Sequence, residues 1–128
     1  MTEKPVTLPR PYLYIASMDV GADHDALFNE VYDTEHLPKL AEVPGVLGVG
    51  RYERVDFEMS IGGEVVPVAV SQPRYHAVYA LESAEVLTSD AWAAAVEAGR
   101  WPSQVRPHTT NRHHMLARAL PPRGRHSG

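Results

Sequence analysis

The 128-residue sequence contains no cysteine. Disulfide bonds, thiolate metal sites and cysteine nucleophiles are therefore excluded. No apolar run approaches the length that a bilayer-spanning helix needs, so we expect no membrane partner. The formal net charge is −4, and no basic cluster precedes the C-terminal tail. Nucleic acid is therefore not expected as a partner, because phosphates are bound mostly by lysine and arginine.

The N-terminus lacks the basic start and apolar run of a secretory signal and instead carries Glu3 and two early prolines. Residues 1–10 are expected to form an extended lead-in, and the protein is expected to be cytoplasmic. The C-terminal residues 120–128 are short, basic and rich in proline and glycine, which predicts a disordered tail. The length predicts one domain over residues 1–128, with a core at about 11–119.

Several catalytic and cofactor motifs are also missing. There is no Gly-x-Ser-x-Gly elbow, and the glycine-rich piece GVLGVG lies at a helix-to-strand turn, where a dinucleotide fingerprint needs strand to helix. No His-x-x-x-His pair occurs, and the adjacent His113 and His114 fall in an expected strand, where their side chains point apart. We expect no metal site and no cofactor.

A strand followed by an amphipathic helix opens the predicted domain. The aromatic and β-branched stretch over residues 12–18 predicts a buried strand, and Asp23 is a suitable helix cap. Pro38 lacks an amide hydrogen, so a regular helix must kink or end just before it, with a second short turn at 38–42. The helix is predicted from residues that recur every four positions on one face: His24, Phe28, Tyr32, His36 and Leu40.

The rest of the chain predicts two hairpin-linked strands, a second helix and a last strand. We expect a strand over 46–59, a tight turn at Gly62-Gly63, an edge position for Pro67, a strand over 74–82, a helix within 83–99 and a strand over 110–120. This order is a βαββαβ plan, an α+β fold with both helices on one face of an antiparallel sheet. Because the other face is left bare, we expect a homodimer with its two sheets face to face.

The stretch YDTEHLPKLAEVPGVLGVGRY, residues 32–52, resembles the dimeric α+β barrel superfamily and, within it, the EthD-like branch. GRWPSQVRPHTTNRHHMLAR, residues 99–118, is similar to uncharacterised relatives. The resemblance implies a ferredoxin-like protomer, a dimer whose sheets form a barrel, and a pocket between sheet and helices. Members include polyketide cyclases, lactone isomerases, cofactor-free monooxygenases, haem-using enzymes and proteins without known activity, so haem on a single proximal histidine stays open.

His36 is the first candidate for chemistry, because its helical line directs the imidazole toward the sheet and burial lowers the pKa of a histidine. The alternative is a core histidine bonded to a carbonyl that Pro38 frees. Tyr32 could donate a hydrogen bond to a substrate oxygen or simply pack in the core. His76 converges on His36 only if the pocket lies on its face of the strand.

Further candidates would bind substrate. Trp92 and Trp101 bracket the second helix and either close the core or cover the pocket. Alternation places Arg112 and His114 on one face of the last strand, where they are either exposed at an edge or bind an acidic group. Alternation alone does not assign the other tyrosines to the pocket or the dimer face. The expected binding residues are Phe28, Tyr52, Trp92, Trp101, Arg112 and His114.

These residues predict a cofactor-independent enzyme that acts by proton transfer, as a cyclase, isomerase or lyase, on a cyclic, aromatic or lactone-like small molecule. His36, Tyr32 and His76 are its expected catalytic residues. Two alternatives remain: a cofactor-free monooxygenase that uses the same pocket, and a non-catalytic ligand-binding or stress-associated dimer. Fold does not decide between them.

Overall fold

The computed structural model describes residue 8 and residues 10–69 and 71–121. Most of the predicted lead-in and tail lie outside the described residues. No helix in the described part of the chain is both long and apolar enough to cross a membrane.

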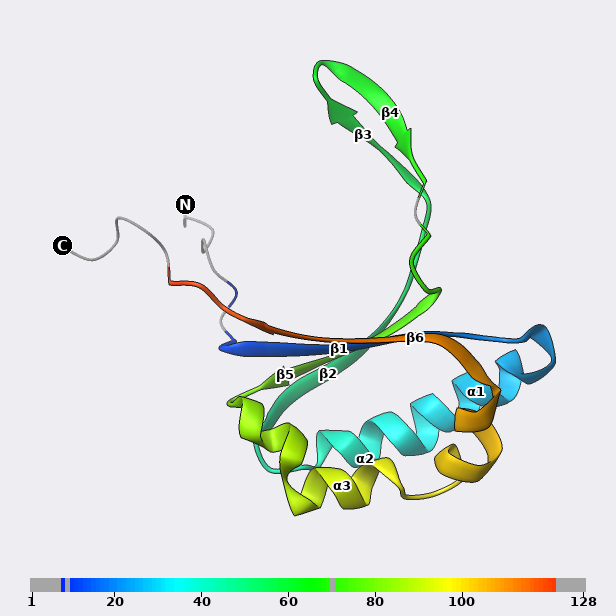
Figure 1. Ribbon diagram of the computed structural model, residues 1–128, viewed down its shortest axis with the longest axis vertical. Helices are drawn as coiled ribbons and strands as arrows, with labels where there is room; N and C mark the ends of the chain where they lie inside the picture. Colours follow the sequence, from blue (N-terminus) through cyan, green and yellow to red (C-terminus); the bar gives the residue numbers. More distant parts are fainter. Residues whose placement is uncertain (1–7, 9, 70, 122–128) are drawn as a thin grey trace.

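The centre of the fold is an antiparallel four-stranded sheet in the order β2-β5-β1-β6. Its strands are β1 (Tyr12–Val20), β2 (Val46–Glu53), β5 (Tyr75–Leu81) and β6 (Thr109–Arg118). Helices α1 (Asp25–Val31), α2 (Leu37–Ala41) and α3 (Asp90–Val96) all cover one face of this sheet, as Figure 1 shows. The predicted βαββαβ plan of a ferredoxin-like protomer is confirmed.

Pro38 does not end the first helix. Between α1 and α2 the chain makes a π-helical turn, η2 (Tyr32–His36), in which the backbone N–H of Leu37 donates to the carbonyl of Tyr32. The sequence predicted that a regular helix would kink or end just before Pro38, with a short second turn after it, and the structure shows such an interruption: α1 gives way to this π-turn and α2 follows. One wide turn takes up the proline, and the helix continues to Ala41.

The second helical segment and the last loop are also less regular than predicted. The segment over 83–99 divides into a 3₁₀ turn, η3 (Ala84–Thr88), and α3, whose first turn is capped by Ser89 through a bond from the Trp92 N–H. A π-helical turn, η4 (Trp101–Val105), and a 3₁₀ turn, η5 (Arg106–His108), then lead into β6. These turns place Trp101 against η2.

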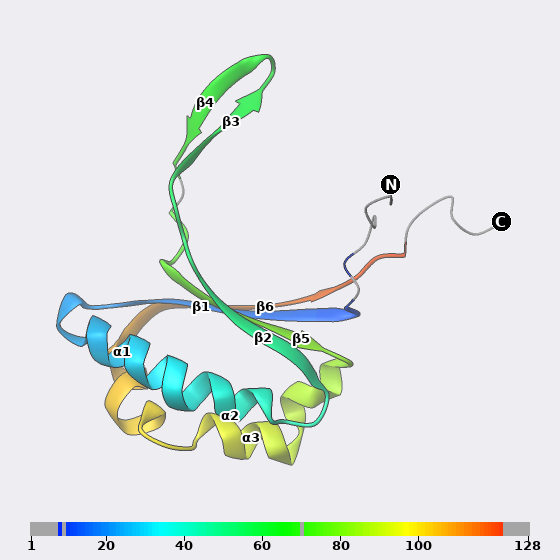
Figure 2. The same ribbon diagram turned by 180° about the vertical axis from the view of Figure 1, so that it is seen from behind.

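The predicted strand over 46–59 is interrupted. β2 ends at Glu53, and β3 (Phe57–Ile61) pairs instead with β4 (Glu64–Val68) in a separate two-stranded sheet. Gly62 and Gly63 form the predicted turn with φ angles of 62° and 85°, which glycine adopts without strain. The two-stranded sheet stands on the side of the main sheet opposite the helices, in both Figure 1 and Figure 2.

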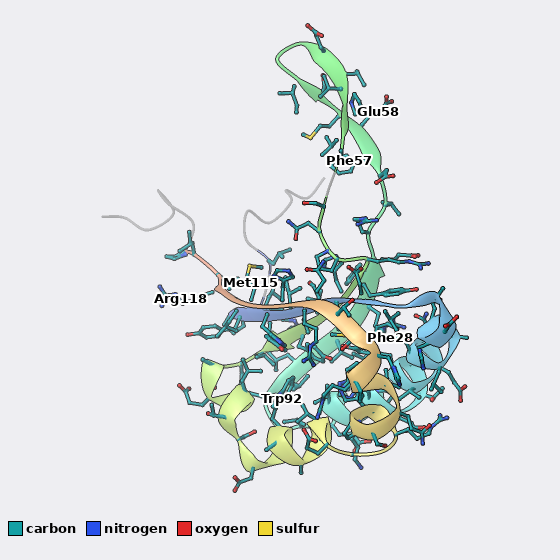
Figure 3. All side chains as sticks on the ribbon, turned by 45° about the vertical axis from the view of Figure 1, so that its right-hand side comes forward. Phe28, Phe57, Glu58, Trp92, Met115 and Arg118 are labelled. Carbon is teal, nitrogen blue, oxygen red and sulfur yellow. The ribbon has the colours of Figure 1, made fainter. Side chains whose placement is uncertain are left out.

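The hydrophobic core lies between the main sheet and the helices. Phe28, Val31 and Leu81 are fully buried there. Figure 3 shows Phe28 and Trp92 below the sheet and Met115 on its open side. Met115 is 53% exposed, so the open face carries apolar surface that the protomer itself leaves in water.

Candidate functional site

A cavity of about 150 Å³ lies between the sheet and the helices. Strands β1, β5 and β6 supply one side, and η2, α3 and η4 supply the other. Its walls include five large aromatic side chains: Tyr14, Tyr32, Tyr79, Trp92 and Trp101. The resemblance implied a pocket in this layer, and the geometry provides one.

His36 lines this cavity from the π-helical turn and is only 6% exposed. Its ring stacks on Trp101, with centroids 4.1 Å apart and planes 13° from parallel. Tyr32 meets the same ring edge-on at 5.0 Å. The imidazole is therefore fixed between two aromatic side chains.

The His36 ring has no hydrogen-bond partner at Nδ1, and this is the one such fully buried side-chain nitrogen or oxygen in the described part of the chain. The bond to a carbonyl freed by Pro38, which was the structural alternative, is not made at this atom. Nε2 makes no hydrogen bond with another described residue either, and it is not fully enclosed. Nε2 is therefore the atom through which the ring can reach a molecule in the cavity.

Burial lowers the pKa of His36 to about 4, and the positive charge of Arg106 adds to this, against a smaller opposing effect of Glu97. The imidazole is therefore neutral at pH 7. A neutral imidazole has one nitrogen lone pair free to accept a proton or a hydrogen bond.

Three tyrosine hydroxyls line the cavity, and all remain protonated at neutral pH. Burial, with a further contribution from Tyr32, raises the pKa of Tyr14 to about 12, and its oxygen lies 2.6 Å from Nδ1 of His114. Burial also raises the pKa of Tyr32 and of Tyr79, whose oxygens lie 3.4 Å apart. The cavity therefore contains hydrogen-bond donors that do not carry charge.

Two arginines reach the cavity, and only one is already paired. Arg106 donates to the carboxylate of Glu97 at 2.7 and 3.1 Å and to the carbonyl of Val96 at 3.1 Å. Arg112 makes no side-chain hydrogen bond or ion pair with another described residue. It lines the cavity with His114 from the edge strand β6, where both residues are exposed, as one of the two alternatives predicted. Arg112 is therefore available to bind an anionic group.

A second cluster of polar contacts, centred on Arg51, lies next to this cavity. Arg51 donates to Asp33 at 2.8 Å and to Asn29 at 2.9 Å, and its guanidinium lies 4.6 Å from the centre of the Tyr32 ring. This cation–π contact holds the far side of the Tyr32 ring. The cluster therefore positions Tyr32 and does not contact the main cavity.

The structure brings together most of the residues that the sequence singled out, but not all. His36, Tyr32, Trp92, Trp101, Arg112 and His114 line one cavity. Phe28 is fully buried in the core beside it.

The structure does not bring His76 to His36. His76 lies on the open face of the sheet, where its Nδ1 is 2.6 Å from the hydroxyl of Ser17, because the inward positions of β1 are the neighbouring Ala16 and Met18. Tyr52 pairs with His76 on that open face and is 62% exposed. The condition under which His76 would converge on His36 is not met, and Tyr52 does not contact the cavity.

Sequence reasoning did not place Tyr14, Tyr79 or Arg106 in the site. Alternation groups Tyr14 with Ala16 and Met18 on one face of β1, but either face could be the inner one. Arg106 lies in a loop with no periodic pattern. Strand pairing shows which face of β1 is the inner one, because Tyr14 lies opposite Tyr79 in the sheet and both rings contact Trp92 of α3.

No family model matches the chain, and no curated protein matches it. Two solved structures are similar. An EthD (ethyl tert-butyl ether) family protein from Bacillus halodurans has 16% sequence identity and a TM-score of 0.55, over 85% of this chain and 99% of its own. A variant of MhuD, solved with two manganese protoporphyrin IX molecules per active site, has 20% identity and a TM-score of 0.50, over 83% of this chain and 91% of its own. The chain has the α+β fold of these two structures, and this is the ferredoxin-like protomer that its sequence predicted.

The cavity does not fit a tetrapyrrole. A volume of about 150 Å³ is that of a cavity that takes up benzene, which is far smaller than a porphyrin. Nor do the described histidines, aspartates and glutamates form a group of three or more that could hold a metal ion.

Proposed function

We propose that this protein binds a flat, single-ring small molecule in the cavity and moves a proton on it, with His36 as the base. The observation that carries this proposal is a buried, neutral imidazole without a hydrogen-bond partner, facing an aromatic cavity. A buried polar atom left unsatisfied costs free energy in the folded protein. A ligand in the cavity meets the ring at Nε2, which is not fully enclosed, and the neutral imidazole can accept a proton there.

Size and wall chemistry define the ligand class. About 150 Å³ accommodates one six-membered ring with small substituents. The stacked and edge-on aromatic walls suit a flat cyclic molecule. The unpaired guanidinium of Arg112 and the Tyr14 hydroxyl suit a carbonyl, enol or carboxylate oxygen on that ring. A cyclic ketone, lactone or small aromatic acid meets these requirements.

The proposed reaction begins with transfer of a proton from an acidic C–H or O–H of the substrate to Nε2 of His36. The electron pair left on the substrate moves to its carbonyl oxygen as an enolate. Protonated tyrosine hydroxyls and Arg112 stabilise that oxygen, and the new imidazolium is itself attracted to the enolate. Return of the proton to a different atom completes an isomerisation. In a cyclisation the enolate carbon attacks a second carbonyl carbon of the same molecule, the π bond of that carbonyl opens to an alkoxide, and the alkoxide takes the proton back from His36.

The low pKa of His36 keeps the ring in its neutral form at pH 7, and it also makes the imidazole a weaker base than a free histidine. In the empty cavity the ring is neutral and ready to accept a proton. An anionic group of the ligand beside the ring would raise the pKa of His36, because an opposite charge favours the charged imidazolium. The base therefore becomes stronger as the negative charge develops on the substrate.

A cofactor-free oxygenase would use the same first proton transfer, and a binding protein would use none. Oxygen consumption during turnover would indicate the oxygenase. Binding of the ligand without exchange of any of its protons would indicate the binding protein.

The open face of the sheet supports a homodimer. Met115 and Leu47 are 53% and 42% exposed, and half-buried Leu13 and Ile15 share the open side of β1. Packing two such faces together would remove this apolar surface from water. In that arrangement the cavity lies on the other side of the sheet, so each protomer keeps its own site.

The test uses α-acetyl-γ-butyrolactone, a single-ring lactone with one acidic C–H. In D₂O, proton NMR follows loss of that hydrogen with and without protein. We expect the protein to accelerate exchange, His36→Gln to remove the acceleration, and His24→Gln, a change outside the cavity, to keep it. Full acceleration by His36→Gln would overturn the role of His36.

A further inference from the structure

The two-stranded sheet of β3 and β4, residues 57–68, is here called the arm. Direct cross-strand partners lie on the same face of a ribbon, and Phe57 pairs with Val68 and Met59 with Val66. One face of the arm is therefore apolar over these two pairs and continues to Ile61 at the tip, whose cross-strand partner is Glu64. The opposite face carries Glu58 and Pro67, followed by Ser60 and Val65.

The apolar face of the arm is not covered by the described part of its own chain. Phe57, Met59 and Ile61 are 45%, 46% and 54% exposed. A lone two-stranded ribbon is marginally stable in water and needs a hydrophobic surface to pack on. A row of apolar side chains on such a ribbon is typical of a surface that contacts another molecule.

We propose that the arm clasps a second copy of this chain, with its apolar face against the flank of the partner. This inference rests on the proposed dimer. The arm rises from the open side of the sheet, away from the helices, in all three views (Figures 1, 2 and 3). A partner docked on that open face would therefore stand beside the arm.

The length of the arm also fits a second copy. Residues 54–62, which comprise the three residues that lead into the arm, its first strand and the start of the turn, span at most roughly 30 Å at about 3.3 Å per residue. Two sheets packed face to face lie only about 10 Å apart. An arm of this length reaches past the sheet of the partner and along its side. In a two-fold symmetric dimer each protomer's arm makes the same contacts with the other protomer.

The charge of the arm is complementary to that of the edge strand β6, which also favours a second copy as the partner. Residues 55–69 contain Asp56, Glu58 and Glu64 and no lysine or arginine. The edge strand β6 contains Arg112, Arg118 and two histidines and no acidic residue. A second copy therefore offers the acidic arm a basic edge, which would attract it most strongly at low salt.

The test compares two variants by analytical ultracentrifugation of the full chain. Met59→Asp places a charge in the apolar face of the arm, and Val65→Asp places the same charge on its opposite face, where Val65 is 68% exposed. We expect Met59→Asp to weaken the dimer about tenfold or more, because burying a charge in an apolar contact is unfavourable. Val65→Asp should change the dissociation constant less than about twofold. Circular dichroism checks that both variants are folded.

The outcomes separate the arm from the dimer itself. If the wild-type protein and Met59→Asp dimerise equally well, the arm proposal is wrong and the dimer stands. If Met115→Asp also leaves the dimer intact, the open sheet face is not the interface. If the wild-type protein stays monomeric at all concentrations, both proposals fall.

Hydrogen exchange gives a second measurement that does not depend on a variant. Amides of a solvated ribbon exchange quickly, whereas amides held against a partner are protected. Protection of residues 57–68 should rise as the protein concentration is raised through the dissociation constant. Exchange at the same rate in monomer and dimer would overturn the proposal.

Discussion

The buried imidazole of His36 should make the protein less stable as the pH falls from 7 to 4. The folded state holds this ring at a pKa of about 4, whereas the ordinary value is 6.5. Between these two values the unfolded chain binds the proton and the folded chain does not. Stability contributed by the neutral ring is therefore present above pH 6.5 and is lost as the pH falls toward 4.

The interval between 6.5 and about 4, at about 1.4 kcal/mol per pH unit, corresponds to about 3 kcal/mol. This conversion is appropriate because the side chain is only 6% exposed and solvent screens it little. A loss of about 3 kcal/mol is a large part of the stability of a small domain. It should therefore be visible in ordinary denaturation curves.

The experiment measures urea unfolding by tryptophan fluorescence from pH 7 to pH 4, at one fixed protein concentration. His36→Phe keeps an aromatic ring on Trp101 and removes the titrating group. We expect the wild-type protein to lose about 3 kcal/mol more than His36→Phe over this range. The control, exposed His113→Gln, should follow the wild-type curve.

Equal pH dependence in the wild-type protein and His36→Phe would refute the reasoning. NMR titration of the His36 ring is an independent check. A midpoint near 6.5 would mean that the ring is solvated and that the cavity does not isolate it.

Two further predictions concern the ligand and the fold. Arg112→Gln should weaken binding of benzoate, used as a single-ring anion, about tenfold in isothermal titration, because a lost charge-assisted hydrogen bond costs about 1.5–3 kcal/mol. Arg118→Gln should leave the affinity for benzoate unchanged. Equal affinities of the two variants would exclude Arg112 as the anion site. Gly45→Ala should lower the free energy of unfolding by about 2 kcal/mol or more, because Gly45 has φ +94° and an added Cβ would meet the Val86 side chain. Gly21→Ala, with nothing near its added Cβ, should change it by less than about 1 kcal/mol in urea unfolding; a similar loss in both would contradict the reasoning.

The fold could be predicted because its local signals are strong. Period-two and period-four apolar patterns, the Gly62-Gly63 turn and the motif around His36 all agree on one βαββαβ order. Pro38 was harder to interpret, since proline forbids a regular α-turn but permits a π-turn. The choice between ending and widening a helix depends on what the next turn packs against.

The site could be predicted only in part. The line through Tyr32 and His36 fixes which way those side chains face, because one face of an amphipathic helix must meet the sheet. A strand gives no such guide when both of its faces carry apolar and polar residues. His76 and Tyr52 were therefore assigned without knowing which face was inner.

The sequence by itself determined the element order, the inward direction of His36 and the bare sheet face, because these follow from local periodicity and from how much apolar surface one protomer can cover. Only the tertiary structure decided which side of the sheet is hollow, that Arg112 faces it unpaired and that residues 57–68 leave the main sheet. The physical reason is that strand pairing joins residues far apart in the chain. Tyr14 meets Tyr79 and His114 only after β1, β5 and β6 have come together.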